Sequence, residues 1–168
     1  MNPQLLSLSE AVGKFLSEQG LTLACAESCT GGWVAAVVTA TAGSSGWFDR
    51  GYVTYSNQAK EEMLGVPAAT IANHGAVSEE TARAMAAGAL EHSSAGVALA
   101  ITGVAGPGGG SPGKPVGTVC FSWCRRGEPA TSETRHWSGD RETVRRQALM
   151  HALNGLIGRL EATAKTVP

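Results

Sequence analysis

The sequence predicts an α/β fold, a three-layer α/β/α sandwich in which a mixed β-sheet lies between two layers of helices. Short apolar segments with the length of buried strands alternate with segments whose apolar residues recur at helical spacing, which is typical of a sheet covered on both faces. The strand-like segments 117–124 and 132–138 follow one another across RRGEPA, so we expect a hairpin. A hairpin is antiparallel, and the sheet is therefore predicted to be mixed.

The individual elements follow from these patterns. Strands are predicted at residues 21–25, 51–56, 95–103, 117–124 and 132–138. Helices are predicted at residues 4–19, 33–40, 57–64 and 78–92. A last helix should begin at Ser138 or Asp140, with an apolar face formed by Val144, Ala148, Leu149, Ala152, Leu156, Ile157 and Leu160.

Size and charge limit the class of protein. The chain has 168 residues, of which 43% are hydrophobic, so we expect a single domain that spans residues 1–168. The formal net charge is -1 without a block of like charges, and a nucleic acid partner is therefore not expected. No apolar run reaches the roughly 18 residues of a membrane span, and the N-terminus lacks the pattern of a signal peptide. We expect a cytoplasmic protein without membrane association.

Four cysteines raise the question of a zinc site. Cys25 and Cys29 form one C-x3-C pair, and Cys120 and Cys124 form another. The second pair lies in a predicted strand, where two residues four apart are separated by roughly 13 Å, too far to share one ion. Buried, reduced thiols are the expected state, and no metal is predicted.

The stretch AESCTGG, residues 26–32, has the strongest chemical character. Ser28 should lie where a buried strand ends and a helix begins, at the carboxyl edge of the sheet, where open α/β folds bind ligands. Such a helix start presents free N–H groups to a phosphate or to the oxyanion of an attacked carbonyl. Alternatively, Ser28 or Thr30 only caps this helix.

A nucleophilic serine needs a base. The four histidines are scattered and no G-x-S-x-G surrounds Ser28, so a Ser-His-Asp hydrolase is weakly supported. Lys60, which follows the strand 51–56 closely, is the alternative base. The competing interpretation is an exposed helix lysine, as most lysines are.

A second glycine cluster covers residues 102–117. Gly108 to Lys114 matches G-x-x-x-x-G-K, but Pro115 stands where a P-loop needs Ser or Thr, and a strand follows instead of a helix. What remains is a glycine-rich loop with Thr102 at its edge. Its length and composition favour a role in ligand contact over a plain surface loop.

Several motifs together resemble one family over residues 5–160. In order they are AESCTGG, AGSSGWF, GYVTYSNQAKEEMLGV, HGAVSEE, ITGVAGPGGG, KPVGTV and WSGDRETVR. They are similar to those of the CinA C-terminal domain, or nicotinamide-nucleotide amidohydrolase, family. The resemblance implies deamidation of nicotinamide mononucleotide to nicotinic acid mononucleotide and ammonia. Two-domain members add an N-terminal pyrophosphatase-like domain, to which nothing here corresponds, so a stand-alone deamidase is expected.

The resemblance also implies roles for single residues. Ser28 would be the nucleophile, Lys60 the base that activates it, and Tyr55 a partner that orients the reacting groups or relays the proton. Thr30, Gly31 and Gly32 would help form the pocket floor and oxyanion site. Thr102 and the loop that follows it, from Gly103 to Gly106, would line the substrate. Arg141 would contact the phosphate. Arg141 would act within one subunit or across an interface. No cofactor is implied, and a homo-oligomer, in particular a dimer, is expected.

A different class of function also fits the motifs. A non-catalytic nucleotide-binding sensor, linked to competence or DNA damage, would need the same pocket. Only the enzyme needs Ser28 beside a neutral Lys60.

Overall fold

The computed structural model describes residues 2–165 and contains one five-stranded sheet. Its strands are β1 (Leu23–Glu27), β2 (Phe48–Val53), β3 (Val97–Gly103), β4 (Thr118–Arg125) and β5 (Thr131–His136). They lie in the order β2-β1-β3-β4-β5. β1 pairs in parallel with β2 and β3, whereas β4 pairs antiparallel with β3 and β5. The predicted mixed sheet is confirmed.

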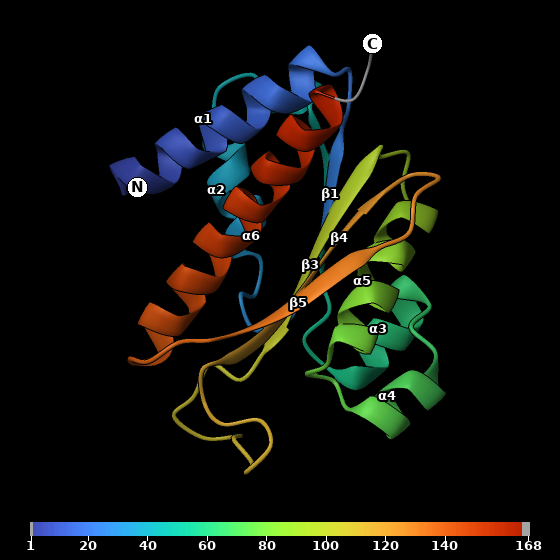
Figure 1. The fold of residues 1–168 in the computed structure, drawn as a ribbon, viewed down its shortest axis with the longest axis vertical. Coiled ribbons are helices and arrows are strands. Elements are labelled where there is room, and N and C mark those ends of the chain that lie inside the picture. Colours follow the sequence, from blue (N-terminus) through green and yellow to red (C-terminus); the bar gives the residue numbers. More distant parts are fainter. Residues whose placement is uncertain (1, 166–168) are drawn as a thin grey trace.

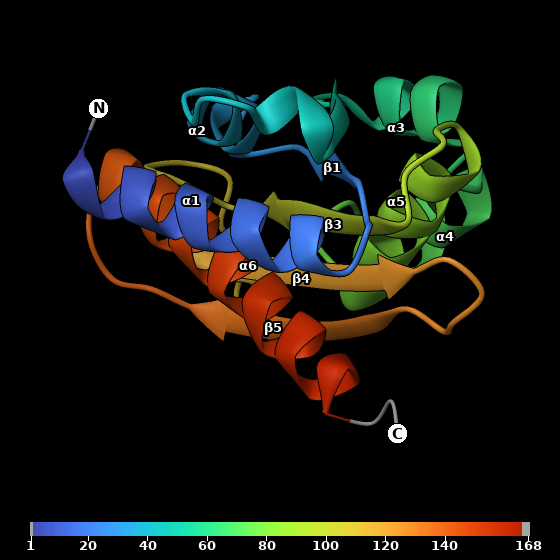
Figure 2. The ribbon, with the colours of Figure 1, turned by 90° about the horizontal axis from the view of Figure 1, so that it is seen from above.

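Helices cover both faces of this sheet. One layer holds α1 (Pro3–Glu18), α2 (Trp33–Thr39) and α6 (Arg141–Ala164), and the other holds α3 (Asn57–Leu64), α4 (Ala68–His74) and α5 (Glu79–Glu91) (Figures 1 and 2). The three-layer α/β/α arrangement is therefore as predicted. No described helix combines the length and the apolar character that crossing a membrane requires.

The two faces of the sheet carry side chains of different size. Residues that alternate along β1 and β3 face opposite layers. Large side chains such as Leu23, Leu99 and Ile101 belong to the core beneath α1, α2 and α6. Alanines such as Ala26 and Ala98 belong to the core beneath α5. The alanine face lets α5 approach the sheet closely.

A glycine on α5 brings α3 close in turn. A Cβ atom at Gly88 would overlap the carbonyl oxygen of Leu64, the last residue of α3. Only a residue without a side chain permits this approach. The contact fixes α3, which carries Lys60, against α5.

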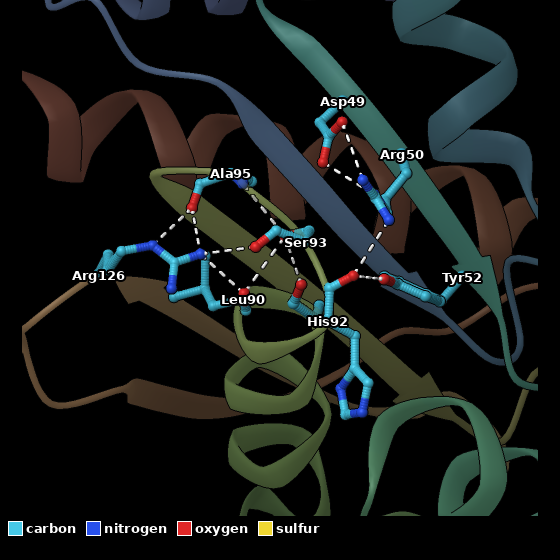
Figure 3. A network of polar contacts seen from close by, with 9 residues as sticks. Asp49, Arg50, Tyr52, Leu90, His92, Ser93, Ala95 and Arg126 are labelled. Atoms are coloured by element: carbon cyan, nitrogen blue, oxygen red, sulfur yellow. Dashed lines mark hydrogen bonds and ion pairs between the residues drawn. The ribbon is translucent and has the colours of Figure 1, made fainter.

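The C-terminal end of α5 is held by cationic and phenolic donors (Figure 3). Arg126 donates to the carbonyl oxygens of Leu90 at 2.7 Å and Ser93 at 3.0 Å. Arg50 and Tyr52 of β2 donate to the carbonyl oxygen of His92 at 3.1 and 2.6 Å. Carbonyls at a helix C-terminus have no partner within the helix, so these bonds satisfy them and join β2 to α5.

Some boundaries differ from the sequence-based expectation. β2 covers residues 48–53 instead of 51–56, so Tyr55 lies beyond the strand. β2 is an edge strand in which no residue is buried and half of the residues are exposed, and its sequence therefore lacks a sharp apolar run. α4 was not predicted, because none of its residues is buried and it has no apolar periodicity. α6 begins after Asp140, which caps it by accepting a hydrogen bond from the N–H of Thr143, and this decides between the two expected starts.

Candidate active site

Ser28 and Lys60 meet at the carboxyl end of β1. Ser28 directly follows β1, and its N–H donates to the carbonyl oxygen of Ile101 on β3 at 2.9 Å. The Nζ atom of Lys60 lies 3.0 Å from the Oγ atom of Ser28 and 2.8 Å from the carbonyl oxygen of Thr54. Both side chains are buried, with 8% of Ser28 and 1% of Lys60 exposed. The interpretation of Lys60 as an exposed helix lysine is therefore wrong.

Burial controls the charge of Lys60. Removal from water disfavours the ammonium form and lowers the pKa of Lys60 below its ordinary value. A Cys29 thiolate would raise this pKa, but burial raises the pKa of Cys29 to about 12, so the thiol is neutral at physiological pH. Within the described residues Lys60 forms no ion pair. Burial without a paired carboxylate therefore shifts Lys60 toward the neutral amine, and the carbonyl oxygen of Thr54 is the hydrogen-bond acceptor that remains for Nζ beside Ser28.

The Ser28 hydroxyl is the better nucleophile of the two neighbouring candidates. Cys29 is buried, and desolvation opposes its ionisation more strongly than the nearby Arg145 and Arg141 favour it. The thiolate is the reactive form of cysteine, so a thiol with this pKa is inert at neutral pH. Ser28 instead has an amine within hydrogen-bond distance.

Most of the predicted site residues surround one cavity of about 200 Å³. Six of its lining residues were expected: Ser28, Lys60, Tyr55, Thr102, Gly103 and Arg141. Ala105 belongs to the loop from Gly103 to Gly106 that was expected to line the substrate, and the sequence interpretation missed four residues: Cys29, Asn57, Ala76 and Val77. Ala76 and Val77 precede α5 and carry no chemical signal, although they lie within the motif HGAVSEE. Thr102 holds this segment by donating to the carbonyl oxygen of Ala76 at 2.7 Å.

Tyr55 and Arg141 form the rim of the cavity. Arg141 donates to the hydroxyl oxygen of Tyr55 at 2.9 Å and to the carbonyl oxygen of Gly106 at 2.8 Å. Tyr55 is 62% exposed, and among the described residues it has no hydrogen bond to Ser28 or Lys60. Gly106 does not line the cavity, but its carbonyl oxygen binds Arg141 at this rim. Arg141 reaches the cavity of its own chain.

Glu27 was missed, although it shapes the loop that follows it. This residue is 1% exposed, and its carboxylate accepts hydrogen bonds from the N–H groups of Gly32, Val34 and Ala35 at 3.1, 3.0 and 3.0 Å. The expectation of free N–H groups at the start of α2 is therefore wrong at these positions. The expectation that Ser28 or Thr30 caps the helix is also wrong, since no cap bond comes from either side chain.

The predicted floor residues Thr30, Gly31 and Gly32 are not among the residues that line the cavity. Thr30 is fully buried, and Gly31 and Gly32 have φ angles of 58° and 94°, which favour glycine. These two glycines turn the chain from β1 into α2. The N–H groups of Cys29 and Thr30 make no hydrogen bond to another described residue, which leaves two donors beside the nucleophile.

A second hollow adjoins the cavity. It has a volume of about 430 Å³ and is lined by Trp33, Arg141, Glu142 and Arg145. Arg141 lines both spaces, so they are neighbours. Arg141 at the junction of the two spaces suits an anionic group, because guanidinium donors bind phosphate oxygens in pairs.

The cysteines do not gather. Cys120 and Cys124 both lie on β4, as expected, and all four cysteines are free thiols. Within residues 2–165, no three His, Cys, Asp or Glu side chains are grouped so that they could hold a metal ion.

Known proteins resemble this chain in both sequence and structure. The nicotinamide-nucleotide amidohydrolase PncC of Escherichia coli K12 is 55% identical over 154 residues, which cover 91% of this chain and 93% of that one. The PncC of Pseudomonas putida is 48% identical over 157 residues, 94% and 97% of the two chains. The crystal structure of the competence/damage inducible protein CihA from Agrobacterium tumefaciens superposes with a TM-score of 0.91 at 42% identity, covering 96% of this chain and 98% of that one. The model of the CinA C-terminal domain matches residues 5–160, and the chain belongs to this family.

Proposed function

We propose that this protein is an amidohydrolase that converts nicotinamide mononucleotide and water to nicotinic acid mononucleotide and ammonia by serine/lysine acyl transfer. The observation that carries the proposal is the buried pair of Ser28 Oγ and Lys60 Nζ, 3.0 Å apart at the wall of a cavity. The similarity to proteins named nicotinamide-nucleotide amidohydrolase supports the substrate.

The first half of the reaction forms an ester. Neutral Lys60 accepts the hydroxyl proton of Ser28 while Oγ attacks the carboxamide carbon of the substrate. The N–H groups of Cys29 and Thr30 bind the oxyanion that develops on the carboxamide oxygen. When the tetrahedral intermediate collapses, the carbon–nitrogen bond breaks, and Lys60 returns the proton to the departing ammonia.

The second half hydrolyses that ester. A water molecule attacks the acyl carbon, and Lys60 accepts a proton from it. The carbon–oxygen bond to Ser28 breaks, the proton moves from Lys60 to Oγ, and the carboxylate product leaves. The carbonyl oxygen of Thr54 can only accept hydrogen bonds, so it holds one N–H of Lys60, and rotation of the neutral amine about this bond can turn its lone pair to the hydroxyl of Ser28.

The two adjoining spaces fit the two ends of the substrate. We place the pyridine ring with its carboxamide in the cavity beside Ser28, and the phosphate in the hollow beside Arg141. Tyr55, held by Arg141, would orient the ring at the rim. Thr102 and Gly103 would line the cavity around the ring, and Gly106 would hold Arg141 at the rim.

The experiment follows ammonia and nicotinic acid mononucleotide after addition of nicotinamide mononucleotide, with Ser28→Ala as control. We expect both products in equal amounts from the wild type and neither from the variant. Binding of the mononucleotide without ammonia release would contradict the enzyme and favour the non-catalytic nucleotide-binding sensor. The single domain over residues 1–168, the cytoplasmic location and the homodimer stay predictions, and light scattering would test the dimer.

A further inference from the structure

Arg145 contacts the backbone of the loop formed by residues 28–32. It lies in the second turn of α6, and its Nε and Nη2 atoms donate to the carbonyl oxygens of Cys29 and Thr30 at 3.0 and 3.1 Å. Its guanidinium group lies 5.4 Å from the centre of the Trp33 ring, a distance at which cation and ring attract each other. One side chain thus fixes two successive carbonyl groups directly after the nucleophile.

The direction of a carbonyl also sets the direction of the next N–H group. The peptide bond between Cys29 and Thr30 is planar and trans, so its C=O and N–H point in opposite directions. Because Arg145 holds the carbonyl of Cys29, the N–H of Thr30 points away from Arg145. The carbonyl of Ser28 is held in the same way by the N–H of Gly31 at 3.0 Å, which orients the N–H of Cys29.

The opposite direction leads to the catalytic cavity. Arg145 comes from α6 on one face of the sheet, whereas Lys60 comes from α3 on the other face (Figures 1 and 2). The lining residues Ala76 and Val77 precede α5 and belong to the same side as α3. An N–H group that points away from Arg145 is therefore directed toward the side of Lys60 and Val77, whereas Arg141 reaches the cavity from the N-terminal end of α6.

We propose that Arg145 is a positioning residue of the oxyanion site. Its bond to the carbonyl of Cys29 orients the N–H of Thr30. Its bond to the carbonyl of Thr30 orients the N–H of Gly31, which holds the carbonyl of Ser28 and so orients the N–H of Cys29, and both free N–H groups then converge on the substrate oxygen. This inference rests on the proposed function for the identity of the reacting group. The positive charge also polarises the peptide group between Cys29 and Thr30, which strengthens the N–H of Thr30 as a donor where negative charge develops. Arg145 acts through the backbone and does not touch the reacting atoms.

The planar fork of arginine is what the site requires. Two of its N–H groups reach two neighbouring carbonyls at once, whereas a lysine ammonium is a point charge without fixed directions. Arg145→Lys keeps the charge and loses the alignment. Misplacement of the donors by about 1 Å lowers kcat by about 100-fold.

The matched control is the next residue on the same helix. Arg146 makes no hydrogen bond or ion pair to the 28–32 loop, and Arg146→Lys should change kcat by less than about twofold. We expect Arg145→Lys to lower kcat with KM nearly unchanged, and to do so equally with nicotinamide mononucleotide and with nicotinamide riboside, which lacks the phosphate. A rise in KM confined to the mononucleotide would overturn the proposal, because Arg145 would then bind the phosphate.

A second measurement does not depend on the substrate. A fluorophosphonate forms a bond from Ser28 Oγ to phosphorus with loss of fluoride, and its phosphoryl oxygen occupies the oxyanion site. The rate of labelling should fall about 100-fold in Arg145→Lys and stay unchanged in Arg146→Lys, even if the wild type fails to deamidate the mononucleotide. Circular dichroism should show both variants folded. In Arg145→Ala, added guanidinium ion should restore labelling, and equal labelling rates in wild type and variants would overturn the proposal.

Discussion

Replacement of Lys60 by arginine tests the base of the proposed mechanism most directly. Arginine keeps the positive charge but does not deprotonate in proteins, so it cannot accept the proton of Ser28. A positioned general base contributes about 10²- to 10⁴-fold to the rate. At 1.36 kcal/mol for each factor of ten, this corresponds to about 3–5 kcal/mol of transition-state stabilisation. Lys60 is the amine that lies 3.0 Å from Ser28, and it is buried. We therefore expect Lys60→Arg to lose the whole contribution of the base.

The assay is the initial rate of ammonia release by wild type, Lys60→Arg and the control Lys14→Arg. Lys14 lies at the surface, where 72% of its side chain is exposed, and its replacement should leave the rate unchanged. Lys60→Arg should lose the rate while still binding the mononucleotide in calorimetry. Turnover by Lys60→Arg within about tenfold of the wild type would refute the reasoning. Tyr55 would then be the remaining candidate base.

The pH dependence gives a second test of the same residue. Burial lowers the pKa of Lys60 in the folded state, and the neutral amine is the active form. The kcat/KM of the wild type should therefore rise with pH through this lowered pKa, on the acid side of an ordinary lysine at about 10.4. Between these two values the unfolded chain binds one proton more than the folded chain, so stability rises with pH in this window. Lys60→Met should remove that rise, and an unchanged stability profile would contradict the burial argument.

Four further changes have definite expected outcomes. Ser28→Ala should lower ammonia release by about 10³-fold or more, whereas Cys29→Ala should keep most of it; reversed results would identify a thiol enzyme. Glu27→Gln should lower the free energy of unfolding in urea by about 2–4 kcal/mol, because three N–H groups lose their charged acceptor, and a change below about 0.5 kcal/mol would count against that role. Prolonged chelation should leave the rate unchanged, and a loss that zinc restores would show a metal requirement. Arg141→Ala should raise KM for the mononucleotide about tenfold but not for the riboside, and equal changes for both would remove Arg141 from the phosphate.

Local patterns were sufficient for most of the fold. The helices at residues 4–19, 78–92 and beyond Asp140 have regular apolar spacing and clear ends, so their positions agree with the structure to within a few residues. The alternation of strands and helices determined the layers. The strand 48–53 and the helix 68–74 were misplaced or missed, because both lie at the surface and bury too little apolar side chain to leave a pattern.

For the candidate site as well, some features followed from the sequence and others only from the tertiary structure. The sequence by itself marked Ser28 as the residue that follows a buried strand, and it marked Lys60 as a candidate base. Only the tertiary structure decided that these side chains, 32 positions apart, lie 3.0 Å from each other, because their distance depends on how α3 packs against α5. Only the tertiary structure also showed that Glu27 is buried. Burial of a carboxylate in an apolar strand is unfavourable unless hydrogen-bond donors surround it, and the folded chain supplies three N–H donors. No local sequence pattern indicates these donors.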